Sequence, residues 1–333
     1  MAKTRKFEHS VIFIKTEGFV NITETVFSHH DTPAPVEILV FGAGAMGSFI
    51  GGLLSRRHKV VLVGRSEHVD AVRAHGLRIT GKTSIVAKPE ASTTVPQNAR
   101  PDWVFVTTKA YDTANAMLAL QRLADRSTFV TLQNGLGNAE TIAKVARRVV
   151  AGTTSIGVTY VGPGEIRHAG VGDTVLGAWS HVDEADLVRL RDLLADVGIV
   201  AQVTSDVRTE LWSKLVVNAS INPLAAVAGV PNGRLVRDKR LLVVLESVCR
   251  EAASVAKAEG AGVDAEEIRH RTVLIAKRTA ANRGSMLQDL DRRHRTEIDA
   301  ITGPIVRAAA RHRIPVPLNQ ALYAVVRARE SAS

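Results

Sequence analysis

Short runs of apolar residues recur along the chain from Val36 onwards, and segments with helical spacing of apolar residues separate most of them. Short apolar runs rich in β-branched residues predict buried strands. Strands that alternate with helices predict a parallel α/β sheet. The expected strands are Ile38–Phe41, Val60–Val63, Trp103–Thr107, Thr128–Leu132 and Val149–Gly152.

A more β-rich stretch follows at Gly157–Gly177, where Gly162-Pro163-Gly164 and Gly170-Val171-Gly172 indicate turns. A helix over Asp183–Asp196 and a strand over Val200–Thr204 complete this part of the chain.

The pattern changes after Ser205, where strand-like runs stop and long amphipathic helical patterns continue to the end. Helix breaks are expected at Asn222-Pro223, Gly229–Gly233, Gly260–Asp264, Gly303-Pro304 and Pro315–Pro317. We therefore predict an α/β nucleotide-binding domain over 36–205 and a helical domain over 206–333. Residues 1–35 lack the periodic apolar pattern of a segment that packs into a core, so we predict a disordered or loosely attached extension.

A glycine-rich turn joins the first strand to a helix-like run that starts at Ser48. In this setting Gly42 allows a tight turn, Gly44 lets a pyrophosphate approach the backbone, and Gly47 lets the helix pack close to the strand. The free N–H groups at the helix start can then hold phosphate oxygens. The pattern predicts dinucleotide binding by the residues Gly42, Ala43, Gly44, Ala45, Met46 and Gly47.

The end of the second expected strand distinguishes between the nicotinamide cofactors. NAD sites place an acidic residue there for the ribose hydroxyls, but Gly64-Arg65-Ser66 offers an arginine. A guanidinium binds a 2′-phosphate with paired, charge-assisted hydrogen bonds, whereas a carboxylate repels it. This favours NADP with Arg65 as the phosphate ligand; the alternative is a solvated arginine in a loop.

Polar residues follow two later strands at the edge where open parallel sheets bind ligands. Lys109 follows the third expected strand, and Asn134 follows the fourth. The ammonium group can attract a carboxylate, and the amide can bridge cofactor and substrate. Either residue could equally serve a turn, because Asn-Gly is a common turn pair.

A polar stripe is expected on one helix of the second domain. Lys214, Asn218 and Asn222 are four residues apart and have apolar neighbours, so they share one face of a helix. Unpaired buried polar groups cost several kcal/mol. The stripe therefore indicates a ligand, with a capping network as the alternative.

A second polar cluster lies between residues 282 and 299. Asn282 and Ser285 can bind a carboxylate or a hydroxyl, and Glu297 can orient a hydroxyl or pair with a lysine. The alternative is an exposed, arginine-rich loop whose acids form weak surface pairs.

Composition narrows the class of protein. The 333 residues carry a net charge of +10, but the arginines are scattered and aromatics are only 4%, so we expect no nucleic-acid partner. No apolar run is long enough to span a bilayer, and we assign no metal site. The single cysteine, Cys249, lies in an apolar helical run and predicts a core residue in a reducing, cytoplasmic compartment.

These stretches resemble the ketopantoate reductase family over about residues 36–329. The resemblance implies an N-terminal Rossmann domain and an all-helical C-terminal domain with the active site between them. It also implies NADPH-dependent reduction of 2-dehydropantoate to (R)-pantoate, a step towards pantothenate and coenzyme A. The matching residues are Gly42–Gly47, Thr108-Lys109-Ala110, Gln133-Asn134-Gly135, Trp212–Asn218 with Asn222-Pro223-Leu224, and Ser285–Asp289 with Arg295–Asp299.

The resemblance also implies roles for the residues singled out above. By this resemblance, Lys214 corresponds to the general acid of the family, and Glu297 corresponds to an acid that orients the substrate. Lys109 and Asn134 would lie near nicotinamide and substrate, and Arg65 at the 2′-phosphate. The family's substrate ligands correspond to Asn218, Asn222, Asn282 and Ser285.

One departure is Gly284, where many members of the family have a second serine before Met286. It leaves room for a paralogue that reduces another 2-oxo acid. A non-catalytic NADP-binding sensor is a third reading, which the complete set of Lys214, Asn218, Asn222 and Glu297 disfavours. A monomer and a homodimer both remain open.

Overall fold

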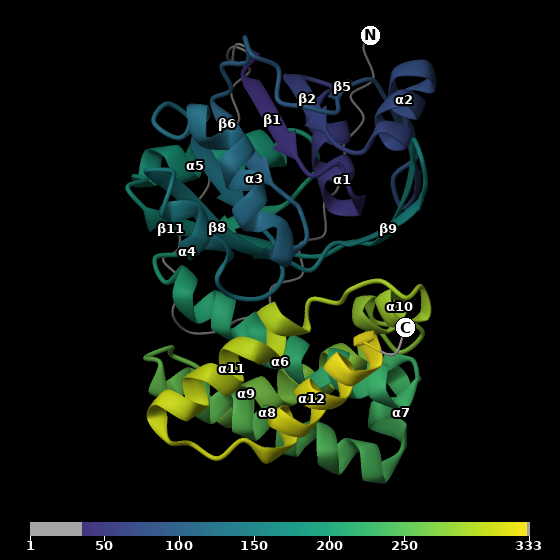
Figure 1. Cartoon of the computed structure of the whole chain (residues 1–333), viewed down its shortest axis with the longest axis vertical. Coiled ribbons are helices and arrows are strands. Elements are labelled where there is room, and N and C mark those ends of the chain that lie inside the picture. Colours follow the sequence, from purple (N-terminus) through teal and green to yellow (C-terminus); the bar gives the residue numbers. More distant parts are fainter. Residues whose placement is uncertain (1–34, 332–333) are drawn as a thin grey trace, which may run out of the picture. The chain divides into compact units, whose positions relative to one another are not determined.

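The computed structural model describes residues 35–331, so the extension predicted for 1–35 lies, apart from Pro35, outside the described residues. An eight-stranded sheet forms the first half (Figure 1). Neighbouring strands of this sheet pair in parallel, except that β11 is antiparallel to β8. Across the sheet the order is β12 (Ala201–Val203), β11 (Thr174–Ser180), β8 (Arg148–Thr154), β7 (Thr128–Thr131), β6 (Trp103–Val106), β1 (Glu37–Phe41), β2 (Lys59–Val63) and β5 (Glu90–Ser92).

The five expected strands correspond to β1, β2, β6, β7 and β8, and the α/β prediction is confirmed. The β-rich stretch contains β9 (Gly157–Gly162) and β10 (Glu165–Gly170) and leads into β11. It joins β3 (Leu77–Gly81) and β4 (Ile85–Ala87) in a second sheet of order β4-β3-β10-β9. The five predicted strands pair in parallel, whereas β11, which follows them, is antiparallel to β8 because the connection through β9 and β10 returns the chain in the opposite direction.

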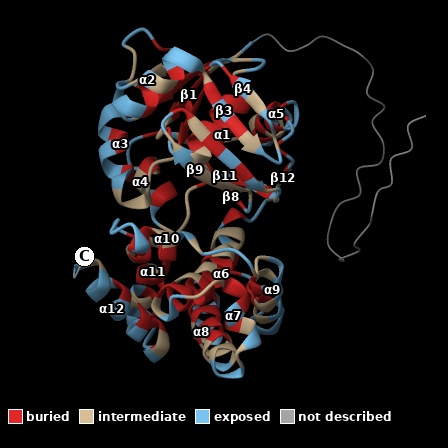
Figure 2. Cartoon of the chain, turned by 90° about the vertical axis from the view of Figure 1, so that its right-hand side faces the viewer, coloured by how far each residue is buried: buried red, intermediate tan, exposed pale blue. Residues whose placement is uncertain are grey.

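Helices cover both faces of the larger sheet, and the side chains of β1 show the layering. Ile38 and Val40 belong to the core cluster that includes α1 (Ala45–Leu54) and α5 (Glu184–Ala195). Leu39 points to the other face, into the cluster that includes α3 (Thr113–Leu120) and α4 (Asn138–Ala143). Figure 2 shows the buried strands between exposed helix surfaces. Burial on both faces explains the continuous apolar runs of these strands.

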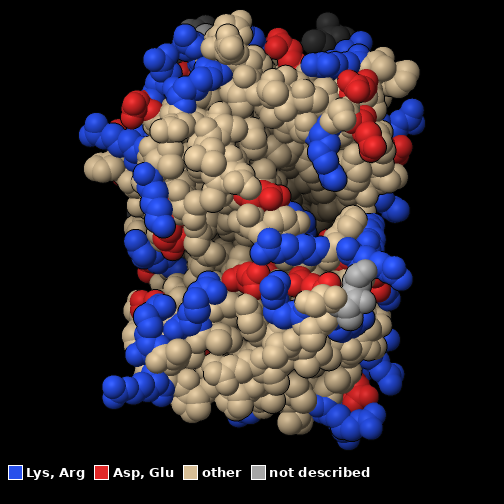
Figure 3. Space-filling view, in the orientation of Figure 1, with Lys and Arg blue, Asp and Glu red and all other residues tan. Residues whose placement is uncertain are grey.

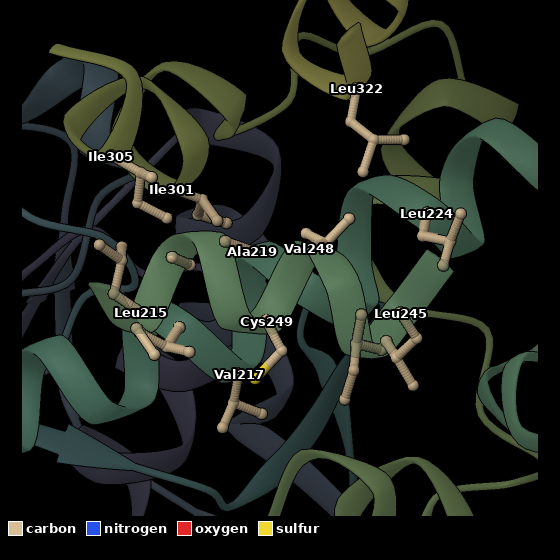
Figure 4. Packing of buried hydrophobic residues seen from close by; sticks show 14 of the residues in the cluster. Leu215, Val217, Ala219, Leu224, Leu245, Val248, Cys249, Ile301, Ile305 and Leu322 are labelled. Atoms are coloured by element: carbon tan, nitrogen blue, oxygen red, sulfur yellow. The ribbon is translucent and has the colours of Figure 1, made fainter. Parts of the chain in front are cut away.

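The second half is helical in the residues that the structure describes. Its longest helices, α6 and α8, pack together, and Figure 4 shows Leu215, Leu245, Val248 and Ile301 in their shared core. Cys249 is a buried free cysteine of this core, as predicted. The helices are α6 (Val207–Ala228), α7 (Asn232–Arg237), α8 (Lys239–Ala258), α9 (Ala265–Arg278), α10 (Ser285–Asp291), α11 (Ile298–His312) and α12 (Pro317–Ser331).

Two of the expected helix breaks were wrong. Pro223 lies inside α6 and Pro304 lies inside α11. A proline removes one helical hydrogen bond, but here the surrounding residues are buried in the helical core, and this packing outweighs the local preference. The other expected breaks are confirmed: α6 ends at Gly229 with φ of 67°, and loops separate α8 from α9 and α11 from α12.

Candidate active site

Four strands of the larger sheet end side by side and bring the predicted nucleotide-binding residues to one edge. Phe41 at the end of β1 pairs with Val63 of β2 and Val106 of β6. Val106 in turn pairs with Thr131 of β7. The residues that follow these strands, namely the glycine turn, Arg65, Lys109 and Asn134, therefore lie along the same carboxyl edge. The strand order of the sheet reverses between β1 and β6, because the chain continues from β1 to β2 on one side and returns to β6 on the other. Open α/β sheets hold ligands at such a point.

The glycine turn between β1 and α1 has the features that a pyrophosphate requires. Gly42 has φ of +109°, a value that disfavours any side chain. A Cβ on Gly47 would lie 2.3 Å from the Gly42 carbonyl oxygen, so only glycine fits where α1 meets the turn. Gly44 is the N-cap of α1, where no side chain caps the helix, and its Cβ position has nothing within 4 Å. The start of α1 thus lacks a side-chain cap and has open space at Gly44, which fits a phosphate group.

Arg65 is exposed and precedes the first turn of α2 (Ser66–His75). The preceding Gly64 packs on Ala43 of the glycine turn, since a Cβ on Gly64 would lie 2.7 Å from the Ala43 Cβ. The arginine therefore stands next to the turn, at the position where NAD sites carry an acid.

Lys109 joins the two halves through carboxylates of the helical half. Its ammonium group donates a hydrogen bond to Asp289 over 2.9 Å and lies 3.7 Å from Glu297. The other Glu297 oxygen accepts the Ala110 backbone N–H at 3.1 Å. Burial lowers the pKa of Lys109, but Glu297 and Asp289 together raise it above its ordinary value. Lys109 is thus a fixed cation that is paired with carboxylates of the protein itself.

Asn134 is half-buried in the segment that follows β7, and this segment packs on α11. A Cβ on Gly135 would lie 2.4 Å from the Ala300 carbonyl oxygen, which itself accepts the Leu136 N–H at 2.9 Å. The Asn134 carbonyl accepts a hydrogen bond from Asn138. These contacts fix the backbone of the segment that carries Asn134 at the carboxyl edge of the sheet.

The predicted polar stripe forms on α6. Lys214, Asn218 and Asn222 are half-buried, whereas most residues between them are fully buried. The helix continues through Pro223, so all three share one face. The stripe is the partly open side of an otherwise buried helix.

Lys214 is the ionisable residue of the stripe, and its pKa is shifted far from the ordinary value of a lysine. Its ammonium group donates a hydrogen bond to the Thr154 carbonyl, at the end of β8, over 2.9 Å. Burial lowers the pKa of Lys214 to about 8, while the negative charge of Glu297 opposes this shift. Glu297 is therefore close enough to act on both lysines, and the proton of Lys214 is available near neutral pH.

Asn282 and Ser285 are exposed residues around the start of α10. The loop that contains Asn282 is held to α7, because the Asn282 carbonyl accepts the Asn232 N–H at 3.0 Å. One turn beyond Ser285, Asp289 is buried and reaches Lys109.

The sequence interpretation missed two polar residues of this region. Asp289 appeared only as part of a matching stretch, and its partner Lys109 is 180 residues away. Asn232 lies in a stretch read as a helix break, yet it is 7% exposed and its Oδ1 has no hydrogen-bond partner. The burial of Asn232 and its position beside the polar stripe cannot be read from the sequence. It could therefore be recognised as a candidate site residue only once the fold was known.

A hollow opens on one face of the molecule, with acidic and basic side chains at its rim (Figure 3). Ala110, Glu297 and Ala300 line a cavity of about 260 Å³ together with Tyr111 and Arg295.

In residues 35–331 we find no cluster of metal-ligating side chains. Over the same range, none of the helices combines the length and apolar character needed to cross a membrane.

Comparison with known proteins agrees with this geometry. The sequence model of ketopantoate reductase PanE/ApbA matches residues 38–181, and that of its C-terminal domain matches residues 206–330. A 2-dehydropantoate 2-reductase of Halobacterium salinarum is 38% identical over 298 residues, covering 88% of this chain and 98% of the relative.

Solved structures share the fold. A PanE/ApbA family ketopantoate reductase from Ralstonia eutropha JMP134 has a TM-score of 0.83 at 35% identity, over 89% of this chain and 99% of that one. A D-mandelate dehydrogenase in complex with NADH and anilino(oxo)acetate has a TM-score of 0.85 at 26% identity, over 89% of this chain and 98% of that one. The chain belongs to the ketopantoate reductase family of pyridine-nucleotide-dependent oxidoreductases.

Proposed function

We propose that this protein reduces 2-dehydropantoate to (R)-pantoate with NADPH, a step of pantothenate and coenzyme A synthesis. The observation that carries the proposal is Lys214, which lies on the polar face of α6 with a pKa of about 8, close to the charge of Glu297. An acid with this pKa, close to the nucleotide edge of a Rossmann sheet, suits the protonation of a reduced carbonyl.

The nucleotide-binding edge supports the choice of cofactor. The N–H groups of Ala45, Met46 and Gly47 at the start of α1 would hold the pyrophosphate, beside the open space at Gly44. Arg65, together with the absence of an acid at the tip of β2, favours the 2′-phosphate of NADPH. Bound NADPH supplies the hydride that the ketone carbon accepts.

Lys214 acts as the general acid in this proposal. As the ketone carbon is reduced, negative charge develops on its oxygen, and the ammonium group stabilises that charge and transfers a proton to it. The Thr154 carbonyl holds Nζ in place. Lys214 finishes the turnover as a neutral amine and regains a proton from solvent, which a pKa of about 8 permits near neutral pH.

Glu297 and the amides would orient the substrate. Glu297 is held by the Ala110 N–H and faces Lys109, so its carboxylate has a fixed direction. Lys109 supplies fixed positive charge near the nicotinamide and the anionic substrate, and Asn134 lies at the same edge. Asn218, Asn222, Asn282 and Ser285 would bind the substrate, and we add the buried Asn232 to this set.

Other features of the proposal concern the whole chain. We place the boundary between the nucleotide-binding and helical domains between β12 and α6, near residue 205. The free, buried Cys249 suits a reducing compartment, and we propose a cytoplasmic enzyme. Its ligands would be small molecules, and it would work as a monomer or a homodimer.

The proposal is tested by steady-state oxidation of NADPH and of NADH with 2-dehydropantoate and a panel of other 2-oxo acids. We expect the highest kcat/KM for NADPH with 2-dehydropantoate. A bulkier 2-oxo acid is the second candidate, because Gly284 leaves free space and the D-mandelate dehydrogenase shares the fold. A higher kcat/KM for an aromatic 2-oxo acid would favour that candidate, and tight NADPH binding without any turnover would contradict both.

A further inference from the structure

Pro304 lies inside α11, four residues after Ala300. In a regular helix the N–H of residue 304 would donate a hydrogen bond to the carbonyl of residue 300. A proline has no N–H, and its ring crowds the carbonyl four residues earlier. The Ala300 carbonyl is therefore left for a donor outside the helix.

The donor is Leu136, whose backbone nitrogen lies 2.9 Å from the Ala300 carbonyl oxygen. Leu136 belongs to the segment that follows β7. The preceding Gly135 has φ of +84°, and a Cβ there would lie 2.4 Å from the same oxygen. The contact thus depends on two special residues: a proline that releases the carbonyl, and a glycine that lets the neighbouring segment approach it.

This contact lies between residues of the proposed active site. Ala300 is one turn after Glu297, whose backbone carbonyl accepts the Ala300 N–H at 3.0 Å. At the other end of the segment 133–136, Gln133 Nε2 donates to the Thr108 carbonyl at 2.8 Å. Asn134 lies between these two attachments, so they hold its backbone in a fixed position relative to the start of α11.

We propose that Pro304 is a positioning residue: by leaving the Ala300 carbonyl to the Leu136 N–H, it holds Asn134 in place relative to Glu297. The effect on catalysis rests on the proposed reduction of a 2-oxo acid. In Pro304→Ala a new helical N–H would compete for the Ala300 carbonyl, and the loss of the ring would let this carbonyl turn back towards the helix. The segment that carries Asn134 would then be held less tightly.

Hydrogen exchange of the ligand-free protein tests the contact itself. The amide hydrogen of Leu136 should exchange at least about threefold faster in Pro304→Ala than in the wild type, which corresponds to the weakening of one hydrogen bond. This measurement needs no substrate and does not depend on turnover.

Steady-state kinetics test the positioning role. The kcat/KM for whichever 2-oxo acid the wild type reduces best should fall at least about threefold in Pro304→Ala. The melting temperature should not fall, because alanine is the better helix former. A proline with a purely structural role predicts a different pattern, in which the melting temperature rises and kcat/KM is unchanged.

Two further variants control for other effects of the substitution. In a Gly135→Ala background, where the added Cβ already prevents the contact, Pro304→Ala should cause no further loss of kcat/KM. Pro317→Ala is the matched control, because Pro317 is the first residue of α12, where an N–H has no helical carbonyl to receive it. This control should keep the wild-type exchange at Leu136 and the wild-type kcat/KM.

The outcomes separate the two proposals. Unchanged exchange at Leu136 in Pro304→Ala would overturn the release of the carbonyl, and faster exchange with unchanged kcat/KM would overturn the positioning of Asn134. No turnover of any 2-oxo acid by the wild type would contradict the proposed reduction instead, and the exchange rates would still decide whether Pro304 controls the contact.

Discussion

The ammonium group of Lys214 donates a hydrogen bond to the backbone carbonyl of Thr154, 2.9 Å away. This contact joins the polar face of α6 to the carboxyl end of β8. An ammonium group has three donors, so the contact fixes the nitrogen while others remain for a substrate oxygen. Burial, opposed by Glu297, sets the pKa of Lys214 at about 8.

The pKa of Lys214 predicts the alkaline limb of the pH–rate profile. The protonated lysine is the active form, and its pKa is lowered from 10.5 to about 8. Activity should therefore be constant on the acid side of this value and fall tenfold per pH unit well above it. The measurement is kcat/KM for the oxo acid between pH 6 and 10 at saturating NADPH. A limb at pH 10 or above would contradict the assignment.

Glu297→Gln should move that limb to lower pH. The carboxylate of Glu297 raises the pKa of Lys214, so its neutral amide lets burial lower the pKa further. The glutamine oxygen can still accept the Ala110 N–H, which preserves the local geometry.

Asp289→Asn is the matched control for Glu297→Gln. Asp289 also contacts Lys109 but makes no contribution to the pKa of Lys214. Its substitution should change the KM for the cofactor or substrate and leave the alkaline limb in place. Equal shifts of the limb in the two variants would show that Glu297 has no special influence on Lys214.

Arg65→Gln should weaken NADPH more than NADH. Loss of a charge-assisted hydrogen bond at an exposed site predicts a rise in the KM for NADPH of about tenfold, with little change for NADH. Arg57→Gln is the control, because Arg57 is also exposed but follows the opposite end of α1. An unchanged ratio of the two KM values in Arg65→Gln would place the 2′-phosphate elsewhere.

His68 links α2 to its surroundings as a neutral ring. Its Nδ1 accepts the Gly164 N–H at 3.1 Å and lies 3.2 Å from the Tyr160 hydroxyl. Because a backbone N–H can only donate, the ring proton resides on Nε2, which lies 3.0 Å from Ser48 Oγ. Burial, together with the charge of Arg65, lowers the pKa of His68 below 6.5.

The neutral state of His68 makes the free energy of unfolding depend on pH. Below pH 6.5 the unfolded chain binds a proton that the folded state resists, so stability should fall as the pH decreases from 6.5 towards the lower folded-state pKa. His68→Asn should lose stability at pH 8 but show a smaller further loss at pH 5. Urea midpoints at both pH values measure this. His75→Asn, on an exposed residue of the same helix, should keep the wild-type dependence; a His68→Asn variant that also keeps it would refute the neutral-ring account.

The parts of this fold that are local in sequence were predictable. The turn from Gly42 to Gly47 is specified by positions where a side chain would collide, and the sequence pattern expresses the same constraint. The stripe on α6 was also predictable, because a spacing of four residues puts Lys214, Asn218 and Asn222 on one helix face.

Features that depend on tertiary packing were not predictable. Pro223 and Pro304 break helices in isolation, yet here burial keeps α6 and α11 continuous. The strands β3 and β4 are short and depend on tertiary contacts, because β3 pairs with β4 and β10 and both strands place side chains in the core. Lys109 and Asp289 have no local relationship, so neither their ion pair nor its effect on the pKa of Lys109 follows from sequence spacing.

The most direct test of the account is the reduction of 2-dehydropantoate by the wild type and by Lys214→Ala with saturating NADPH at pH 7. The account predicts turnover by the wild type and a kcat lowered about 10²- to 10⁴-fold in Lys214→Ala, the usual contribution of a general acid. NADPH binding should be retained in the variant, because Lys214 lies outside the glycine turn. Full activity of Lys214→Ala, or no reduction by the wild type, would contradict it.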